Sequence, residues 1–210
     1  MKKLSLKEFA NDLGSEITIF SNGKWALNKQ MATAINIGVD VKNANGCVIV
    51  DIGDTTTEVF IITGRRVFFH YSTMAVSYDI LIQDIVLYMR YMHRLRINEV
   101  VAKRIWDAVG SALPDLDEEP AAYDLIGPNC VTALPQKVSV SSTEIAHCLD
   151  KSIRRIEFAI QQLLKSAPCG VCTAIACTGI CLTGKGASLR GLDKRLETNF
   201  NISCLPYPLT

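Results

Sequence analysis

CVIVDIGDTTTEVFIIT, residues 47–63, consists of two apolar runs joined by a polar turn. Both runs are rich in β-branched residues, and two such runs around a short turn predict an antiparallel hairpin. The turn contains Asp51, Gly53 and three successive threonines, residues 55–57. A hairpin tip needs no more than Asn-Gly or Asp-Gly. The polar chemistry therefore exceeds what the geometry requires, which indicates a binding role.

The composition is that of a globular protein with a sizeable core. The chain has 210 residues, 49% of them hydrophobic, and a net charge of +1. A near-neutral chain lacks the basic surplus of nucleic-acid-binding proteins, so we expect no nucleic-acid partner. No apolar run reaches the roughly 18–20 residues that cross a bilayer, and no secretory signal is recognised. The eight cysteines lie in apolar segments, which favours buried, reduced thiols in a cytoplasmic protein.

Strand and helix signals continue on both sides of this hairpin. Asn22-Gly23 predicts an early hairpin, and Ser141 with Glu144 three residues later predicts a helix N-terminus. Further strands are expected at 17–20, 25–27, 67–72, in short pieces over 124–140, at 180–183 and at 202–205. Helices are expected at 30–38, from 77 onward, at 98–112, from 141 to before Pro168, and after the turn 184–188, including Leu189. The pattern predicts a mixed sheet covered by helices.

Two segments share the pattern Asp-x-Gly, then polar residues, then threonine. They are residues 12–18 and 51–57, and both lie at a strand–turn–strand tip, which indicates a duplicated unit. Glycine lets backbone N–H groups approach an anion, hydroxyls add donors, and a carboxylate at a strand end can orient water on Mg²⁺. A third segment, residues 182–189, breaks a buried strand into a glycine turn before a helix. Together the three segments predict a polyphosphate site.

These motifs, in this order, resemble the MreB family of bacterial actin-like rod-shape proteins, within the actin, Hsp70 and sugar-kinase superfamily. Residues 12–18 and 51–59 look like two phosphate loops, 103–112 like the helix beside the adenosine, and 182–192 like the adenosine-side glycine turn. The resemblance implies an α/β, actin-like (ribonuclease H-like) ATPase-type lobe with a mixed sheet and covering helices. Residues 30–35 resemble a segment that normally lies far downstream, so the first lobe is expected to be largely missing.

The resemblance implies a division into three parts and a function. Residues 1–45 would be a remnant of the first lobe, 46–73 with 138–210 the large subdomain of the second lobe, and 74–137 its small subdomain. The implied function is an ATP-binding cytoskeletal filament protein in cell-shape determination and cell-wall morphogenesis, with ATP and Mg²⁺ as cofactors. Implied partners are further copies or full-length relatives, a RodZ-type membrane adaptor and the inner membrane surface. The implied ATPase is weak, and because the family's proposed catalytic Glu lies in the missing region, no catalytic residue is assigned.

The resemblance also implies binding residues. Asp12 and Asp51 would orient Mg²⁺ through water. The expected phosphate contacts are Gly14, Ser15, Glu16, Ile17, Gly53, Asp54, Thr55 and Thr56. The expected adenosine contacts are Lys103, Arg104, Ile105, Trp106, Gly184, Lys185, Gly186, Ala187 and Ser188. Asp54, Thr55 and Lys185 stand where the family has glycines, and Lys185 either offsets the charge of Asp54 or blocks the adenosine.

Two alternative functions stay open: a non-catalytic interaction module, and a decayed fragment that no longer binds nucleotide or polymerises. Zinc is a further option for four cysteines with one Cys-x-x-Cys spacing: Cys169, Cys172, Cys177 and Cys181. Small buried or loop thiols are favoured, because no second pair closes the site. A basic stretch is expected to be a solvated helix face rather than a patch for an acidic partner or a membrane: Arg90, Arg94, Arg96, Lys103 and Arg104.

Overall fold

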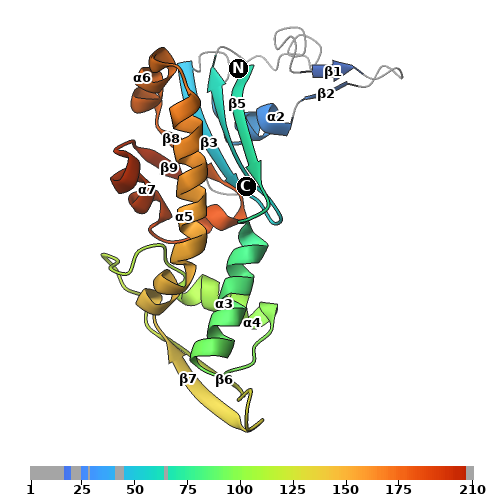
Figure 1. The fold of residues 1–210 in the computed structure, drawn as a ribbon, viewed down its shortest axis with the longest axis vertical. Helices are drawn as coiled ribbons and strands as arrows, with labels where there is room; N and C mark the ends of the chain where they lie inside the picture. Colours follow the sequence, from blue (N-terminus) through green and yellow to red (C-terminus); the bar gives the residue numbers. More distant parts are fainter. Residues whose placement is uncertain (1–16, 20–24, 28, 41–44, 64–65, 207–210) are drawn as a thin grey trace.

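A five-stranded mixed sheet lies in the upper half of the molecule in Figure 1. The structure, a computed structural model, describes residues 17–19, 25–27, 29–40, 45–63 and 66–206. The strand order is β5-β4-β3-β8-β9, with β3 at Asn45–Ile52, β4 at Thr57–Thr63, β5 at Arg66–Thr73, β8 at Ile180–Thr183 and β9 at Cys204–Pro206. β3, β4 and β5 form an antiparallel meander, which confirms the predicted hairpin, and β8 and β9 run parallel to β3.

Helices cover both faces of this sheet because the side chains of its inner strands are apolar on both sides. Val48 and Val50 of β3 pack into a core beneath α5, Ser142–Ser166, which lies along the sheet in Figure 1. Cys47 and Ile49, which alternate with them, pack against Met31 of α2, Lys29–Asn36. Period-two burial on two faces is what a central strand requires.

The segment between β5 and α5 forms the opposite end of the molecule from α6 (Figure 1). It contains α3 at Tyr78–Met92, α4 at Glu99–Val109 and the antiparallel strands β6 at Tyr123–Pro128 and β7 at Pro135–Val140. The N-cap side chains of Ser77, Asn98 and Ser141 each accept a hydrogen bond from a backbone N–H in the first turn of α3, α4 and α5. Such caps stabilise a helix start by about 1 kcal/mol. The predicted cap at Ser141 is confirmed.

Three sequence predictions need correction. Residues Cys169–Thr178, considered above as loop or buried thiols, form the helix α6. The last helix, α7 at Leu192–Phe200, begins three residues after Leu189, because Gly191 at its N-cap takes a left-handed conformation with φ of 72°. Cys130, Cys169 and Cys177 are exposed, so the prediction of buried thiols is wrong for them. Cys130 lies in the loop between β6 and β7, and the other two lie on α6, of which only Ile175 is buried.

The early hairpin is described in part. β1 at Ile17–Ile19 pairs antiparallel with β2 at Trp25–Leu27. The pairing agrees with the strands expected there, while the Asn22-Gly23 turn lies outside the described residues. Among the helices that the structure describes, none has the length and apolar character needed to cross a membrane.

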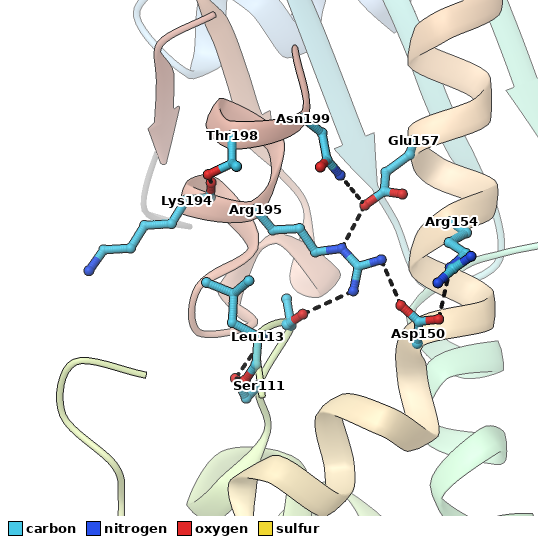
Figure 2. A network of polar contacts seen from close by, with 10 residues as sticks. Ser111, Leu113, Asp150, Arg154, Glu157, Lys194, Arg195, Thr198 and Asn199 are labelled. Carbon is cyan, nitrogen blue, oxygen red and sulfur yellow. Dashed lines mark hydrogen bonds and ion pairs between the residues drawn. The ribbon is translucent and has the colours of Figure 1, made fainter. Parts of the chain in front are cut away.

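Arg195, whose side chain is 13% exposed, joins α7 to α5 (Figure 2). Arg195 donates from Nε to Glu157 over 2.6 Å and from Nη2 to Asp150 over 2.8 Å, and its Nη1 donates to the carbonyl of Ala112 over 3.0 Å. Asp150 also pairs with Arg154 over 2.8 Å. One guanidinium thus donates hydrogen bonds to two carboxylates and a carbonyl. It thereby joins the segment that follows α4 to helices α5 and α7.

Candidate functional site

The polar turn between β3 and β4 is fastened to the start of α3. Gly53 N–H donates to Thr56 O over 3.0 Å and closes the turn. The N–H groups of Tyr78 and Asp79 donate to the carbonyls of Gly53 and Asp54 over 2.9 and 3.0 Å. The turn therefore has a fixed backbone, which is the property that a loop needs to hold donors toward a ligand.

Several donors of this turn are not used by the hydrogen bonds that hold it. In the described part of the chain, no hydrogen bond is formed by the N–H groups of Asp54 and Thr55 or by the hydroxyls of Thr55 and Thr56. Thr55 is exposed and Thr56 half-buried. Consecutive free N–H groups with neighbouring hydroxyls are the donor set that suits phosphate oxygens.

The glycine turn after β8 lies directly beside the end of β3. The register Asp51↔Thr183 places residues 184–188, which include the short 3₁₀ helix η2 at Lys185–Ser188, against the polar turn. Gly184 has φ of 85°, and a Cβ there would lie 2.4 Å from the carbonyl oxygen of Ile52 and 2.6 Å from Oδ1 of Asp51. A Cβ on Gly186 would lie 2.2 Å from Cγ2 of Ile52. Both glycines are thus required for the two turns to meet.

An ion pair bridges the two turns. The ammonium of Lys185 lies 2.7 Å from Oδ1 and 2.9 Å from Oδ2 of Asp54. The hydrogen bond to Asp54 raises the pKa of Lys185 above its ordinary value. The same ammonium lies 6.0 Å from the centre of the Tyr78 ring. Lys185 therefore reaches from the glycine turn to the polar turn.

Tyr78 and α4 form the other side of the site. The Tyr78 ring meets Trp106 edge-on at 5.4 Å between centroids, and Lys103 lies 5.9 Å from the Tyr78 centroid. Trp106 Nε1 donates to Ser188 Oγ over 3.4 Å, and Ser188 donates to the carbonyl of Lys185 over 2.8 Å. Helix α4 and η2 are thus held together by side chains predicted to face adenosine. Sequence reasoning missed Tyr78, because it joins the site through the contact between the start of α3 and the polar turn.

Two carboxylates lie opposite each other on β3 and β4, next to the polar turn that joins these strands. Asp51 pairs in register with Glu58, and burial raises the pKa of Asp51, with Lys29 opposing and Glu58 adding to the shift. Burial alone would raise the pKa of Glu58, but hydrogen bonds from Lys29 and Gln30 lower it overall. His70 Nε2 lies 3.4 Å from Glu58. Lys29, Gln30 and His70 had no role in the sequence analysis, because no local pattern links them to Glu58.

A model of the MreB/Mbl protein family matches residues 5–206. The chain belongs to the MreB/Mbl family. The cell shape-determining protein MreB of Escherichia coli (strain K12) is 33% identical over 186 residues, which are 88% of this chain and 53% of that protein. This MreB/Mbl-family chain therefore spans about half the length of the curated relatives it matches.

The structural comparison gives the same family. The crystal structure of MreB5 of Spiroplasma citri bound to ADP has a TM-score of 0.81 at 26% identity, over 97% of this chain and 59% of that chain. The structure of MreB5 bound to AMPPNP has a TM-score of 0.79 at 26% identity, over 85% of this chain and 52% of that chain. The predicted actin-like fold, with a mixed sheet and covering helices, is confirmed.

Of the nucleotide-binding residues expected from the resemblance to MreB, the structure brings some together and leaves others apart or undescribed. Asp12, Gly14, Ser15 and Glu16 lie outside the described residues, and of Ile17 the structure describes the place in β1. Of the expected adenosine contacts, Ile105, Trp106 and Gly186 are buried, and Arg104 is exposed. The residues that converge are Asp51, Gly53, Asp54, Thr55, Thr56, Lys103, Trp106, Gly184, Lys185 and Ser188, with Ala187 half-buried beside them.

The donor set of this MreB-type site fits a magnesium nucleotide. Free N–H and hydroxyl groups at the polar turn suit phosphate oxygens, and the half-buried carboxylate of Asp51 suits an oxygen-loving cation or its water. The half-buried Tyr78 ring adds aromatic surface, and it packs edge-on against the buried Trp106 ring. The zinc site considered for the four cysteines has no such support. The described residues contain no group of three or more His, Cys, Asp or Glu side chains that could hold a metal ion.

Proposed function

We propose that this chain binds a magnesium-complexed adenine nucleotide between the β3–β4 turn and the glycine turn of η2. The observation that carries the proposal is the meeting of the two turns at Asp51, made possible by Gly184. Binding of ADP and AMPPNP by MreB5, which is 26% identical, supports an adenine nucleotide as the ligand class. The proposed role is that of a cytoskeletal filament protein in cell-shape determination and cell-wall morphogenesis.

Each part of the site has a proposed task. The N–H groups of Asp54 and Thr55 and the hydroxyls of Thr55 and Thr56 would hold phosphate oxygens. Asp51 would orient water on Mg²⁺, and the metal, when bound, would neutralise phosphate charge. Trp106 and Ser188 would border the adenosine. We assign binding to these residues and no hydrolytic step to any of them.

The wider assignments are proposals that follow from the family. Further copies and full-length relatives are the proposed filament partners, and a RodZ-type membrane adaptor and the inner membrane surface are the proposed anchors in a cytoplasmic location. Residues 46–73 with 138–210 are proposed as one subdomain and 74–137 as a second, with 1–45 as the remnant of the first lobe. The sheet supports this division, because all five of its strands come from the first of these sets.

Calorimetric titration with Mg-ATP tests the binding proposal. We expect binding at micromolar strength, about −8 kcal/mol, by the full chain. The Asp51→Asn variant should bind at least about tenfold more weakly, because it removes one charged hydrogen-bond acceptor. Asp124→Asn is the matched control, since Asp124 is exposed on β6 and pairs with Lys137 over 2.7 Å. Equal affinity of the Asp51→Asn variant and the unmodified chain contradicts the proposal.

A second candidate function is an interaction module that needs no nucleotide. It is favoured by exposed apolar side chains at the end of α3 and on the β6–β7 hairpin: Tyr91, Met92, Ile126, Val131 and Leu134. Exposed apolar side chains of this kind occur at protein-binding surfaces. Co-sedimentation with a full-length relative, unchanged by nucleotide and lost in a Tyr91→Ser, Met92→Ser variant, would support this function. Co-sedimentation that requires nucleotide would exclude it.

A further inference from the structure

Lys185 joins two turns that a nucleotide would have to share. We propose that Lys185 is a phosphate-recognition residue that changes partner, pairing with Asp54 in the free chain and with the phosphate chain of a bound nucleotide. The inference rests on the proposed function, since it names a residue and a charge class for that same site. It also reverses the expectation that Lys185 is an adenosine contact.

The position of the ammonium carries the first step. Lys185 belongs to η2, yet its Nζ lies within 2.9 Å of both carboxylate oxygens of Asp54, at the tip of the polar turn. The free N–H and hydroxyl groups suited to phosphate belong to Asp54, Thr55 and Thr56 in the same turn. The cation is therefore placed with the phosphate donors rather than with Trp106.

The charges around the turn carry the second step. The negative charges of Asp54 and Asp79 both favour the charged form of the Lys185 ammonium. Asp51 lies at the base of the turn, beside Gly184. A bound phosphate chain would add negative charge next to these carboxylates. The repulsion costs free energy unless a cation neutralises part of the charge. Lys185 supplies such a cation, since it already pairs with Asp54 at the tip of the turn. An ammonium on a flexible stem with three donors is suited to exchange one anion for another.

The exposure of the pair carries the third step. The side chains of Lys185 and Asp54 are 57% and 52% exposed. Exposed ion pairs of this kind contribute little to stability, so water and salt ions compete with them easily. The backbone below is fixed, because Gly184 and Gly186 are packed against Ile52. Exchange of partner thus needs a rotation of the side chain and no movement of either turn.

Four forms of the full chain test this inference by calorimetric titration with Mg-ATP, Mg-ADP and adenosine. They are the unmodified chain, Lys185→Met, Asp54→Asn, and the double variant. Methionine keeps much of the aliphatic stem near Tyr78 and removes the charge. The matched control is Lys194→Met with Asp117→Asn, another exposed ion pair, which joins α7 to the loop after α4.

The expected results have opposite signs for the two partners. Lys185→Met should weaken Mg-ATP binding about tenfold, since it removes a charged hydrogen bond and leaves Asp54 facing the phosphates. Asp54→Asn should tighten it about threefold, because Lys185 no longer has a competing carboxylate. Adenosine, which has no phosphate, should bind all four forms equally. The control pair should change neither affinity.

Three results would overturn the inference. Tighter Mg-ATP binding by Lys185→Met would mean that Lys185 blocks the site. Unchanged affinity in that variant, with Mg-ATP bound by the unmodified chain, would remove the inference and leave the proposed function standing. Absence of nucleotide binding in all four forms, each with a cooperative thermal unfolding transition, would remove both.

Discussion

Two ion-pair systems in this molecule differ in what surrounds them. Arg195 and Glu157, between α7 and α5, have side chains that are 13% and 17% exposed (Figure 2). Lys185 and Asp54, between the two turns of the candidate site, are 57% and 52% exposed. The Arg195 guanidinium donates to three acceptors, whereas the Lys185 ammonium pairs with one carboxylate, that of Asp54, among the described residues. The same chemistry therefore serves stability in one place and exchange in the other.

The largest expected effect comes from removing Arg195, the cation of the ion-pair network between α7 and α5. Arg195→Met should lower the free energy of unfolding by about 3 kcal/mol, because Glu157 and Asp150 lose their shared cation while staying partly buried. Denaturant unfolding followed by circular dichroism measures the change. Lys194→Met, which removes an exposed pair from the same helix, is the control and should leave the transition midpoint in place. A loss of less than about 1 kcal/mol for Arg195→Met would mean that the network is not structural.

A second prediction concerns the rigid base beneath the exposed pair. Gly184→Ala should destabilise the fold by about 2 kcal/mol or more, because its Cβ would collide with Ile52 and a φ of 85° disfavours alanine. Gly170→Ala is the control: its Cβ would meet no atom within 4 Å, and it lies in α6. Alanine should stabilise that helix by roughly 0.5–1 kcal/mol. Equal behaviour of the two variants in thermal unfolding would show that the turns are not closely packed.

A smaller effect, with a defined pH dependence, is expected at Asp51. Because burial raises the pKa of this carboxyl in the folded chain, the ionised form is disfavoured there. The contribution of Asp51 to stability should therefore fall as pH rises from below about 4, the ordinary pKa of aspartate, through the raised value. Asp51→Asn does not titrate, so its advantage in melting temperature should grow over that window and then stay constant at neutral pH.

The control for this prediction has the opposite sign. Hydrogen bonds from Lys137 and Ser139 hold the pKa of Asp124 below its ordinary value, so Asp124→Asn should lose a little stability at neutral pH and none in acid. Thermal scans from pH 3 to pH 7 compare both variants with the unmodified chain. If the melting temperature of Asp51→Asn at pH 7 were below that of the unmodified chain, the ionised Asp51 carboxylate would not be destabilised by its burial.

The smallest expected effect completes the comparison of the two ion pairs. Asp54→Asn and Lys185→Met should each leave the unfolding midpoint unchanged while they alter nucleotide affinity, because this pair is exposed and adds little to the fold. Chemical denaturation of each variant without nucleotide measures this directly. A clear loss of stability in either variant would place Lys185–Asp54 with Arg195 as a structural pair.

Local patterns were enough to predict most of the sheet and several helices. The β-branched runs around Asp51 define β3 and β4, and Ser141 with Glu144 fixes the start of α5. Helix α6 escaped prediction because its sequence, CGVCTAIACT, has apolar and small residues on every side and therefore no apolar stripe of helical period. Leu189 was placed in α7 because no pattern signalled the left-handed residue Gly191.

The candidate site was predictable where it follows the chain and hidden where it depends on tertiary contacts. Asp51, Gly53 and Gly184 were found from two short motifs. Tyr78 became part of the site because α3 starts against the polar turn, and Glu58 gained Lys29 and Gln30 because α2 packs on that face of the sheet. The Lys185–Asp54 bond joins positions 131 residues apart. Pairings over such distances follow from the fold and have no local signature.

Amide hydrogen exchange with and without Mg-ATP tests the central claim most directly. We predict that nucleotide slows exchange in two separate segments, residues 53–56 and 184–188, while the β6–β7 hairpin keeps its rates. Protection at both turns would mean that they hold one ligand between them. Protection elsewhere, with both turns unchanged under saturating nucleotide, would contradict the assignment of this site.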